Sequence, residues 1–335
     1  MNVDERIAAF DRLGTALVTL TNDEFKSLAF KAASENPWFT EDNIRMAISS
    51  LHLMLSEQAL QNWTSSYVFN GNPKKVAVVM AGNIPLVGFH DFLCVLISGH
   101  SILIKSSSKD NALIQFVVQL LTIIEPRYGE RIEFAERLKG FDAIIATGSD
   151  NTSRYFEYYF GKYPNIIRRN RTSVAVLSGL ENDDEIKNLG IDIFSYFGLG
   201  CRNVSKLFVP RSFSLEQVFT SWQPYHDVIN HHKYCNNYDY QKSILLVGQV
   251  PFFDGGYVML QETEKLVSPI SVIYFEYYNS SDDLRSKLAA NREKIQCIVD
   301  NSGEHSSIKF GRAQYPAPGD YADQVDTLKF LTGLN

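Results

Sequence analysis

Hydrophobic and polar positions along the chain follow two successive patterns, and the change between them falls near residue 65. Before that point apolar residues recur at helical spacing, most clearly over Ile44–Leu55, behind Thr40, a residue type suited to cap a helix. After it, short continuous apolar runs alternate with segments of helical spacing. This alternation predicts parallel strands covered by helices on both faces, which is a doubly wound α/β sheet.

The second pattern predicts two α/β units in succession. In the first we expect strands over Lys75–Gly82, Ser101–Lys105, Ile132–Phe134 and Ala143–Thr147, and helices over Pro85–Ser98, Lys109–Glu125 and Asn151–Phe160. In the second we expect strands near Ser173–Leu177, Ser205–Val209, Ser243–Val247, Ser271–Glu276 and Gln296–Val299, and helices over Asp183–Phe197 and Leu215–Asn230.

The boundary between the two units is predicted near residues 168–172, where the polar run Arg168–Arg171 interrupts the apolar pattern. We therefore expect a first domain over 1–170, which includes the N-terminal helices, and a second over 171–310. Residues 311–335 form a loop-like tail. Two docking places stay open for this tail, the first domain and a partner subunit.

Bulk composition narrows the class of protein. A chain of 335 residues exceeds one typical domain, and a net charge of −6 without a basic block argues against a nucleic-acid partner. The four cysteines lie far apart and form no Cys-X-X-Cys pair, which favours a reducing compartment. The N-terminus lacks an apolar signal core, and polar residues interrupt the longest apolar region, Val76–Ile104. We expect a cytoplasmic protein without a membrane span.

Cys201 is the strongest candidate for chemistry. It directly follows Gly198-Leu-Gly200, where an open backbone permits close approach, and it lies between a helical and a strand-like segment. A thiolate in this setting can attack a carbonyl carbon. The alternative is a small buried apolar residue, since free cysteines are commonly buried. Core packing is the expected role of Cys94 and Cys297, which lie on apolar segments.

Six short segments reinforce this interpretation through their shared order and spacing. They are Met80–Pro85, Gly99–Ser107, Ala146–Ser149, Gly198–Cys201, Ser268–Ser271 and Phe310–Arg312. Together they resemble the motifs of the aldehyde dehydrogenase superfamily, over roughly residues 76 to 320. More narrowly, they resemble the acyl-CoA reductases of the bacterial bioluminescence type.

The resemblance implies an aldehyde dehydrogenase-like α/β fold with two Rossmann-like doubly wound domains and a cleft between them. The first domain would bind NAD(P), and the second would carry Cys201 as the nucleophile. The oxyanion formed by its attack needs preorganised donors, and the resemblance assigns these to the Asn83 amide and the Cys201 backbone N–H. The alternative for Asn83 is a turn residue or helix cap ahead of Pro85.

The resemblance also implies a set of cofactor-binding residues. Lys105 would contact the adenosine ribose together with Ser106, and Gly148 and Ser149 would meet the pyrophosphate at a helix N-terminus. No Gly-X-Gly-X-X-Gly occurs in the chain, and the family lacks it too. The cofactor is NADPH or NADH. The serines after Lys105 tilt the expectation towards NADPH because they leave room for a 2′-phosphate, and Lys109 is either a further phosphate contact or a solvated lysine.

Two departures from the family pattern bear on the reaction. Hydrolytic members carry a glutamate that activates water, whereas the corresponding stretch Ile167–Ser173 has no carboxylate. This favours a thiol-exchange enzyme that reduces an acyl-CoA thioester to an aldehyde through a Cys201 thioester. The second departure is at the glutamate that contacts the nicotinamide ribose. The aligned position falls on Lys265, and Glu264 is the neighbouring candidate.

Substrate, partners and rival functions follow from the same reading. Arg168, Arg169 and Arg171 are candidates to bind coenzyme A phosphates, the alternative being a solvated hinge. His231, His232 and Cys235 supply at most three ligands, so no metal site is expected.

Expected partners are an acyl-CoA or acyl-carrier substrate, a second copy of the chain and an acyl-transferring enzyme. Reduction of acyl phosphates or protein-bound acyl groups, a non-catalytic binding subunit with this fold, and a metabolite-binding protein stay open as rivals.

Overall fold

The computed structural model of the chain describes residues 1–69, 72–148 and 150–334. Within them the chain forms two compact units. Unit 1 comprises residues 1–170 and 315–335, and unit 2 comprises residues 171–314. Residues 311–314 thus belong to unit 2, and the rest of the C-terminal tail returns to unit 1.

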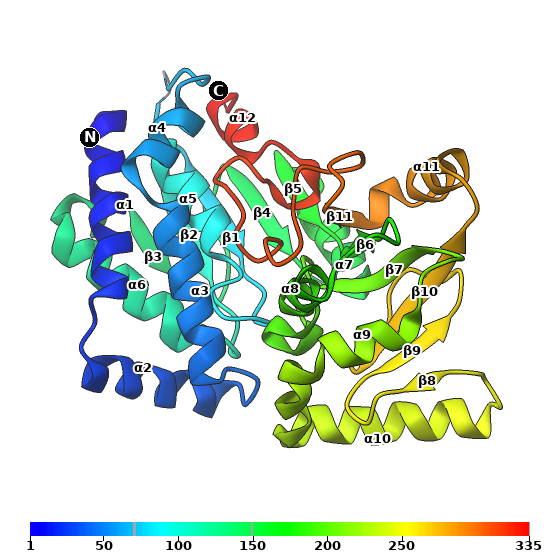
Figure 1. The fold of residues 1–335 in the computed structure, drawn as a ribbon. Coiled ribbons are helices and arrows are strands. Elements are labelled where there is room, and N and C mark those ends of the chain that lie inside the picture. Colours follow the sequence, from blue (N-terminus) through cyan, green and yellow to red (C-terminus); the bar gives the residue numbers. More distant parts are fainter. Residues whose placement is uncertain (70–71, 149, 335) are drawn as a thin grey trace. The chain divides into compact units, whose positions relative to one another are not determined.

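Unit 1 begins with a layer of helices. These are α1 (Val3–Val18), α2 (Asn22–Glu35), α3 (Glu41–Met54) and α4 (Glu57–Thr64), drawn in blue in Figure 1. Capping boxes start the first two, because Asn2 pairs with Glu5 and Thr21 pairs with Glu24 through reciprocal side-chain and backbone hydrogen bonds. Each helix buries one apolar face, and Phe10 of α1 is fully buried in the core of the unit.

The sheet of unit 1 has five parallel strands in the order β3-β2-β1-β4-β5. Their bounds are β1 Lys75–Val79, β2 Ser101–Lys105, β3 Ile132–Phe134, β4 Ala143–Thr147 and β5 Asn165–Arg168. The connecting helices are α5 (Phe89–Ile97), α6 (Asn111–Ile124) and α7 (Asp150–Phe160). Alternate strand residues face different layers: Val76 packs in the core with α1, α5 and α6, and Ala77 packs with Phe156 of α7. The sheet is therefore doubly wound.

Unit 2 contains a six-stranded sheet in the order β11-β6-β7-β10-β9-β8, parallel except for β8. Its strands are β6 Thr172–Val176, β7 Val204–Pro210, β8 Phe253–Asp254, β9 Met259–Glu262, β10 Val272–Tyr278 and β11 Ile295–Asp300. Its helices are α8 (Asp183–Phe194), α9 (Leu215–Ser221), α10 (His232–Val247) and α11 (Ser281–Ala290). Ala175 packs with α8 and α9 on one face, and Val174 packs with α11 on the other.

The strand predicted near Ser243–Val247 is wrong. This segment is the last turn and a half of α10, whose buried residues Tyr234, Tyr238 and Leu245 follow helical spacing. The exposed side chains include Ile244 and Val247, so the apolar run that resembled a buried strand is largely a helix surface. Short apolar runs do not by themselves separate strand from helix.

Three predicted helices are shorter than expected by at least three residues at one end. The helix expected from Pro85 begins at Phe89, because Leu86 adopts a left-handed φ of 57°. The helix expected over Leu215–Asn230 stops at Ser221 and continues as a 3₁₀ segment that starts with Gln223-Pro224. The helix expected to reach Phe197 ends at Phe194.

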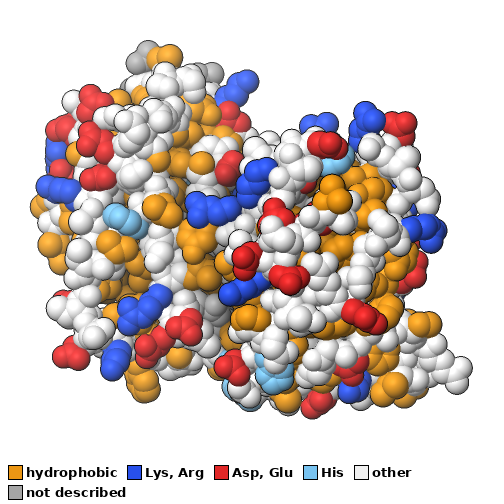
Figure 2. Space-filling model, in the orientation of Figure 1, with side chains coloured by type: hydrophobic (Ala, Val, Ile, Leu, Met, Phe, Trp, Pro, Cys, Tyr) orange, Lys and Arg blue, Asp and Glu red, His pale blue; other side chains and the backbone are white. Residues whose placement is uncertain are grey.

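The space-filling view shows acidic and basic side chains interspersed over the displayed face (Figure 2). No helix in the described ranges is long and apolar enough to cross a membrane.

A buried ion pair holds the C-terminal tail on unit 1. Arg168, at the end of β5, is 3% exposed and lies 2.6 Å from Asp91 of α5. Its guanidinium also donates to the Ala322 carbonyl (2.7 Å) and to Thr327 Oγ1 (2.8 Å), which begins α12 (Thr327–Thr332). The buried guanidinium of Arg168 therefore links strand β5, helix α5 and the C-terminal tail.

We predict that Arg168→Ala lowers the free energy of unfolding by about 3–5 kcal/mol, because it leaves the carboxylate of Asp91 buried without its cation. The matched control is Arg169→Ala, whose ion pair with Glu157 (2.6 Å) is exposed and should contribute at most about 1 kcal/mol. Urea unfolding of both variants measures the difference. Equal losses would contradict a tail-anchoring role for Arg168.

Candidate functional site

Cys201 lies in a turn of unit 2 between a short 3₁₀ segment, Ser195–Gly198, and strand β7. The turn is partly buried. Three consecutive residues before it have left-handed backbones: Tyr196 (φ 50°), Phe197 (φ 56°) and Gly198 (φ 76°). For a residue other than glycine this conformation costs roughly 1–2 kcal/mol, so surrounding contacts must hold the loop in place.

Asn203 supplies those contacts. Its side chain is buried, its Nδ2 donates to the carbonyls of Asp192 (3.0 Å) and Ser195 (2.8 Å), and its Oδ1 accepts from the Gly200 N–H (2.8 Å). One amide thereby joins the end of α8 to the glycine that precedes Cys201. The sequence analysis missed Asn203 because nothing local distinguishes it from a surface asparagine next to a turn.

Further hydrogen bonds fix Cys201 and the residue after it, and tie both to neighbouring segments. Ser173 Oγ, on β6, donates to the Cys201 carbonyl oxygen (3.0 Å). Arg202 Nε donates to the Ala313 carbonyl (2.5 Å). Asp192, fully buried on α8, accepts from the backbone N–H groups of Gly311 (2.6 Å) and Ala313 (2.9 Å). The segment 311–313 is therefore tied both to the end of α8 and to the residue after Cys201.

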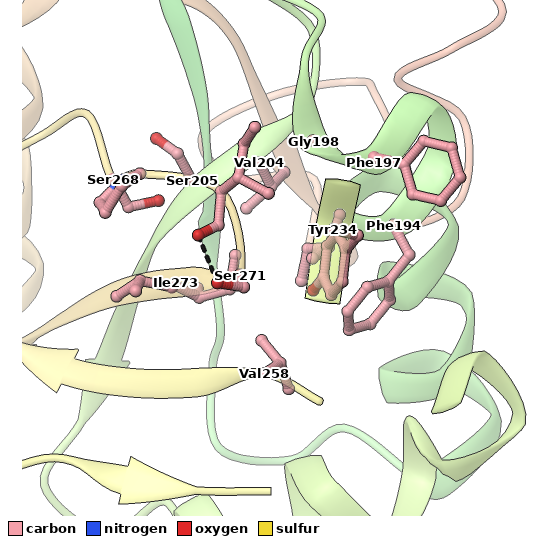
Figure 3. Close-up of a pocket in the computed structure, with 14 residues that line it drawn as sticks. Phe194, Phe197, Gly198, Val204, Ser205, Tyr234, Val258, Ser268, Ser271 and Ile273 are labelled. Atoms are coloured by element: carbon pink, nitrogen blue, oxygen red, sulfur yellow. Dashed lines mark hydrogen bonds between the residues drawn. The ribbon is translucent and has the colours of Figure 1, made fainter. Parts of the chain in front are cut away.

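A small cavity of about 30 Å³, lined by apolar side chains and by serines, lies beside this loop (Figure 3). Gly198 and Val204, on either side of Cys201 in the chain, both line it, as do Phe194, Phe197 and Tyr234. Its opposite wall comes from the β9–β10 connection and the start of β10, residues 268–273. The aromatic rings of Phe194 and Phe197 line this cavity. The Trp222 ring does not, because it is fully buried in the core of unit 2.

The predicted oxyanion donor Asn83 and the predicted cofactor residues Lys105 and Gly148 lie at one edge of the unit 1 sheet. Asn83 is exposed on the turn after β1, Lys105 is the exposed last residue of β2, and Gly148 directly follows β4. The carboxyl ends of parallel strands share an edge, and the strand order reverses between β1 and β4. Ligands of open α/β sheets bind at such a switch point.

The side chains of Lys105 and Ser106 at this edge form hydrogen bonds within unit 1. Lys105 Nζ donates to the Glu136 carbonyl (2.9 Å), and Ser106 Oγ donates to Asn111 Oδ1 (2.8 Å). A Cβ on Gly148 would lie 2.9 Å from the Phe156 ring, so only glycine lets the strand end approach α7 this closely. Gly148 leads to the N-terminus of α7, which suits an anion. Ser149 lies outside the described residues.

Glu264 lies in unit 2, exposed on the connection between β9 and β10. The backbone beside it is held by Lys206, a buried residue of β7 whose Nζ donates to the Thr263 carbonyl (2.9 Å) and pairs with Glu276. Ser205 Oγ donates to the Leu266 carbonyl (3.0 Å). Through this connection the chain passes from the Glu264 position to the wall of the cavity beside the Cys201 loop.

The three arginines proposed for coenzyme A differ in what they offer a phosphate. Arg168 has its guanidinium occupied within unit 1 and almost no exposed surface, so we do not carry it into the functional proposal. Arg169 is exposed and pairs with Glu157, and Arg171 donates to the Ile295 carbonyl (3.4 Å). A phosphate role for Arg169 and Arg171 stays a prediction.

The histidines and remaining cysteines have other surroundings. No group of three or more metal-ligating side chains occurs in the part of the chain that the structure describes. His231 packs on the Phe197 ring, with centroids 4.4 Å apart, and on His232. Cys94 is fully buried, and burial raises the pKa of its thiol well above its usual value. Cys297 is buried against Ser173 Oγ (3.0 Å).

The fold has clear counterparts among solved structures. An aldehyde dehydrogenase from Physcomitrella patens, solved with the reaction product succinate, superposes with a TM-score of 0.66 at 12% identity, covering 99% of this chain and 84% of that one. A Mycobacterium tuberculosis aldehyde dehydrogenase complexed with NAD+ gives 0.64 at 12% identity, covering 90% and 73%. A mutant of aldehyde dehydrogenase C from Pseudomonas syringae, with NAD+ and octanal, gives 0.63 at 12% identity, covering 90% and 77%.

These similarities confirm the predicted aldehyde dehydrogenase-like α/β fold. By sequence, no family model matches the chain, and a search of the curated proteins finds no match. At this level of identity the likeness concerns the fold, and the chemistry has to be argued from the chain's own residues.

The buried carboxyl of Asp192 generates a prediction on pH. Burial raises the pKa of Asp192 to about 7, although the Gly311 and Ala313 N–H groups and two nearby arginines oppose the shift. Because the unfolded chain has an aspartate pKa near 3.9, the folded state binds more protons between about pH 4 and 7. The free energy of unfolding should therefore fall by about 2–4 kcal/mol as pH rises through this window and level off above it.

The measurement is urea unfolding across this pH range for the wild type, Asp192→Asn and Asp184→Asn. Asp184 is exposed on the same helix and makes an equal change of charge. The slope should disappear in Asp192→Asn alone. A slope that persists in that variant would assign the effect to other groups.

Proposed function

We propose that this protein is an NAD(P)H-dependent acyl-CoA reductase that forms an aldehyde through a thioester on Cys201. The observation that carries the proposal is the Cys201 loop, a strained backbone held by a buried asparagine, in a chain with the aldehyde dehydrogenase fold. When bound, NAD(P)H supplies the hydride that reduces the thioester carbon.

The first step belongs to the chain itself. The Cys201 thiolate attacks the carbonyl carbon of the acyl-CoA, a new carbon–sulfur bond forms, and the coenzyme A thiolate leaves and takes up a proton. The left-handed residues before Gly200 and the Asn203 hydrogen bonds fix the course of the backbone at Cys201. A fixed nucleophile loses little freedom when it reaches the attack geometry.

Charge on the carbonyl oxygen needs donors, and we assign them to the Cys201 N–H and the Asn83 side chain. Asn83 is exposed on the turn after β1, at the carboxyl edge of the unit 1 sheet. Donors of this kind act mainly on charge that develops in the transition state.

The lack of a base favours reduction over hydrolysis. Residues 167–173 contain no carboxylate, and Thr172 and Ser173 within this stretch are committed to hydrogen bonds with Ser205 and with the Cys201 carbonyl. Water needs a general base to compete for a thioester, whereas a thiol or a reduced cofactor does not.

The cofactor preference we propose is NADPH. A carboxylate at the end of the second strand of a Rossmann sheet binds the ribose 2′-hydroxyl and repels a 2′-phosphate. Here Lys105 ends that strand, three serines follow it, and both Ser108 and Lys109 are exposed. Residues 105–109 thus offer cations and hydroxyls and no carboxylate.

We predict that Cys201→Ala abolishes covalent labelling by an acyl-CoA whose acyl group is isotopically labelled, because no thioester can form. Cys235→Ala is the matched control, a partly buried cysteine of the same unit. Intact-protein mass spectrometry after mixing, without cofactor, reads the label. Equal labelling of Cys201→Ala and wild type would remove Cys201 from the mechanism and overturn the proposed function.

We also predict that Lys109→Ala lowers kcat/KM for NADPH by roughly tenfold and leaves kcat/KM for NADH nearly unchanged, since one charge-assisted phosphate contact contributes about 1–2 kcal/mol. Lys26→Ala, an exposed lysine of α2, makes the same change of net charge elsewhere in unit 1. Parallel losses for both cofactors would contradict a 2′-phosphate contact.

A further inference from the structure

Two turns at the carboxyl edge of the unit 1 sheet touch each other. The turn after β1 carries Asn83, and the loop after β2, whose last residue is Lys105, carries Ser106 to Lys109. A Cβ on Gly82 would lie 2.5 Å from Ser107 Oγ and 3.1 Å from the Lys109 Cβ, so the two segments approach as closely as a glycine allows. Under the proposed function, one turn stabilises the oxyanion and the other binds the cofactor.

The C-terminal end of α2 forms a hydrogen bond to the turn after β1. Asn36, the residue after the helix, is 4% exposed, and its Nδ2 donates to the Gly82 carbonyl across 3.0 Å. Its Oδ1 accepts from the Trp38 N–H (3.1 Å). The Gly82 carbonyl belongs to the peptide unit whose N–H is that of Asn83, so this hydrogen bond orients the peptide plane that carries the Asn83 side chain.

The same end of α2 also forms hydrogen bonds to the start of α6, which directly follows the loop after β2. Glu35 Oε2 accepts from the backbone N–H groups of Asn111 and Ala112, both at 2.8 Å. These are the first two donors of α6, which a helix leaves without intrahelical partners. A carboxylate is especially effective there, because the N-terminus of a helix carries positive partial charge.

Asp110 joins the two turns directly. It precedes α6, is buried, and its Oδ2 accepts from the Leu86 N–H across 2.8 Å. Leu86 has a left-handed backbone and lies just before α5, so this bond supports a strained residue in the turn that carries Asn83. Helix α2, the turn after β1 and the start of α6 are therefore connected through three side chains.

We propose that Asn36 and Glu35 are positioning residues, through which the N-terminal helical layer holds the Asn83 turn and the cofactor loop, Asn36 acting on the first and Glu35 on the second. The proposal rests on the proposed function. It assigns to α2 a role beyond packing: Asn36 acts on turnover by orienting Asn83, and Glu35 acts on cofactor binding by fixing the start of α6 beside Lys105 to Lys109.

The two assignments predict opposite kinetic signatures. Asn36→Asp is nearly isosteric and can still accept from Trp38, but it cannot donate to the Gly82 carbonyl. It should lower kcat roughly tenfold, with KM for NADPH within about twofold of wild type. Glu35→Ala should raise KM for NADPH roughly tenfold, with kcat within about twofold. A role confined to stability would instead move both constants together, or neither.

The experiment is steady-state kinetics of the wild type, Asn36→Asp, Asn36→Ala and Glu35→Ala with acyl-CoA and NADPH. Glu24→Ala is the matched control, since it removes the cap at the other end of α2 and touches neither turn. Glu35→Gln is the conservative rescue, because its amide oxygen can still accept from α6. Hydrogen exchange of the peptides that cover residues 80–88 and 106–113 reports the two turns separately, whatever the activity.

Faster exchange at residues 80–88 in the Asn36 variants, faster exchange at 106–113 in Glu35→Ala, and the split between kcat and KM support the inference. Two results overturn it: kinetic losses in Glu24→Ala equal to those in the other variants, or unchanged exchange and kinetics in the Asn36 and Glu35 variants. If the wild-type protein neither binds NADPH nor is labelled by acyl-CoA, the proposed function is wrong. The kinetic half of this inference would then fail with it, and the exchange result would show whether the contacts clamp the turns.

Discussion

The candidate nucleophile depends on one buried amide. Asn203 spans the end of α8 and the glycine before Cys201 with hydrogen bonds of 2.8–3.0 Å, and these bonds offset the cost of the left-handed Tyr196 and Phe197. Glycine favours the left-handed backbone at Gly198, but nothing in the local sequence favours it at Tyr196 and Phe197, so the surrounding fold must impose it there. Gly198 and Val204, on either side of Cys201 in the chain, both line the small cavity shown in Figure 3.

Buried polar side chains also hold the turns at the carboxyl edge of the unit 1 sheet. The parallel strands bring Asn83, Lys105 and Gly148 to one side of the sheet, but strands alone do not fix the turns that carry them. Side chains from a different layer do so: Asn36 and Glu35 at the end of α2, and Asp110 before α6. In both units the residues proposed for chemistry lie on irregular backbone, and buried polar side chains hold that backbone in place.

The sequence could predict what periodicity and short motifs encode. The alternation of buried strands and helices predicts the α/β fold, which the solved structures confirm, and the motif order points to Cys201. Periodicity failed at Ser243–Val247, because the four-residue apolar run Ile244–Val247 is too short to distinguish a strand from a helix. Asn36 and Asp192 could not be found, because they bind partners 46 and 121 residues away in the chain. Asn203 binds partners at most 11 residues away, but it could not be found because nothing in the sequence shows that its side chain is buried. The buried position of Arg168 could not be predicted either. A run of arginines suggests solvent exposure, and the sequence does not show that Asp91 lies beside Arg168.

The central claim is that Cys201 holds an acyl group that water cannot remove. The most direct test is the lifetime of the acylated enzyme, followed by intact-protein mass spectrometry after one equivalent of acyl-CoA is mixed with the protein in the absence of cofactor. We predict that the acyl adduct persists in buffer, is lost as aldehyde when NADPH is added, and returns to a thioester when free coenzyme A is added. Rapid appearance of free fatty acid without cofactor would contradict the account and point to a hydrolytic enzyme whose base lies outside residues 167–173.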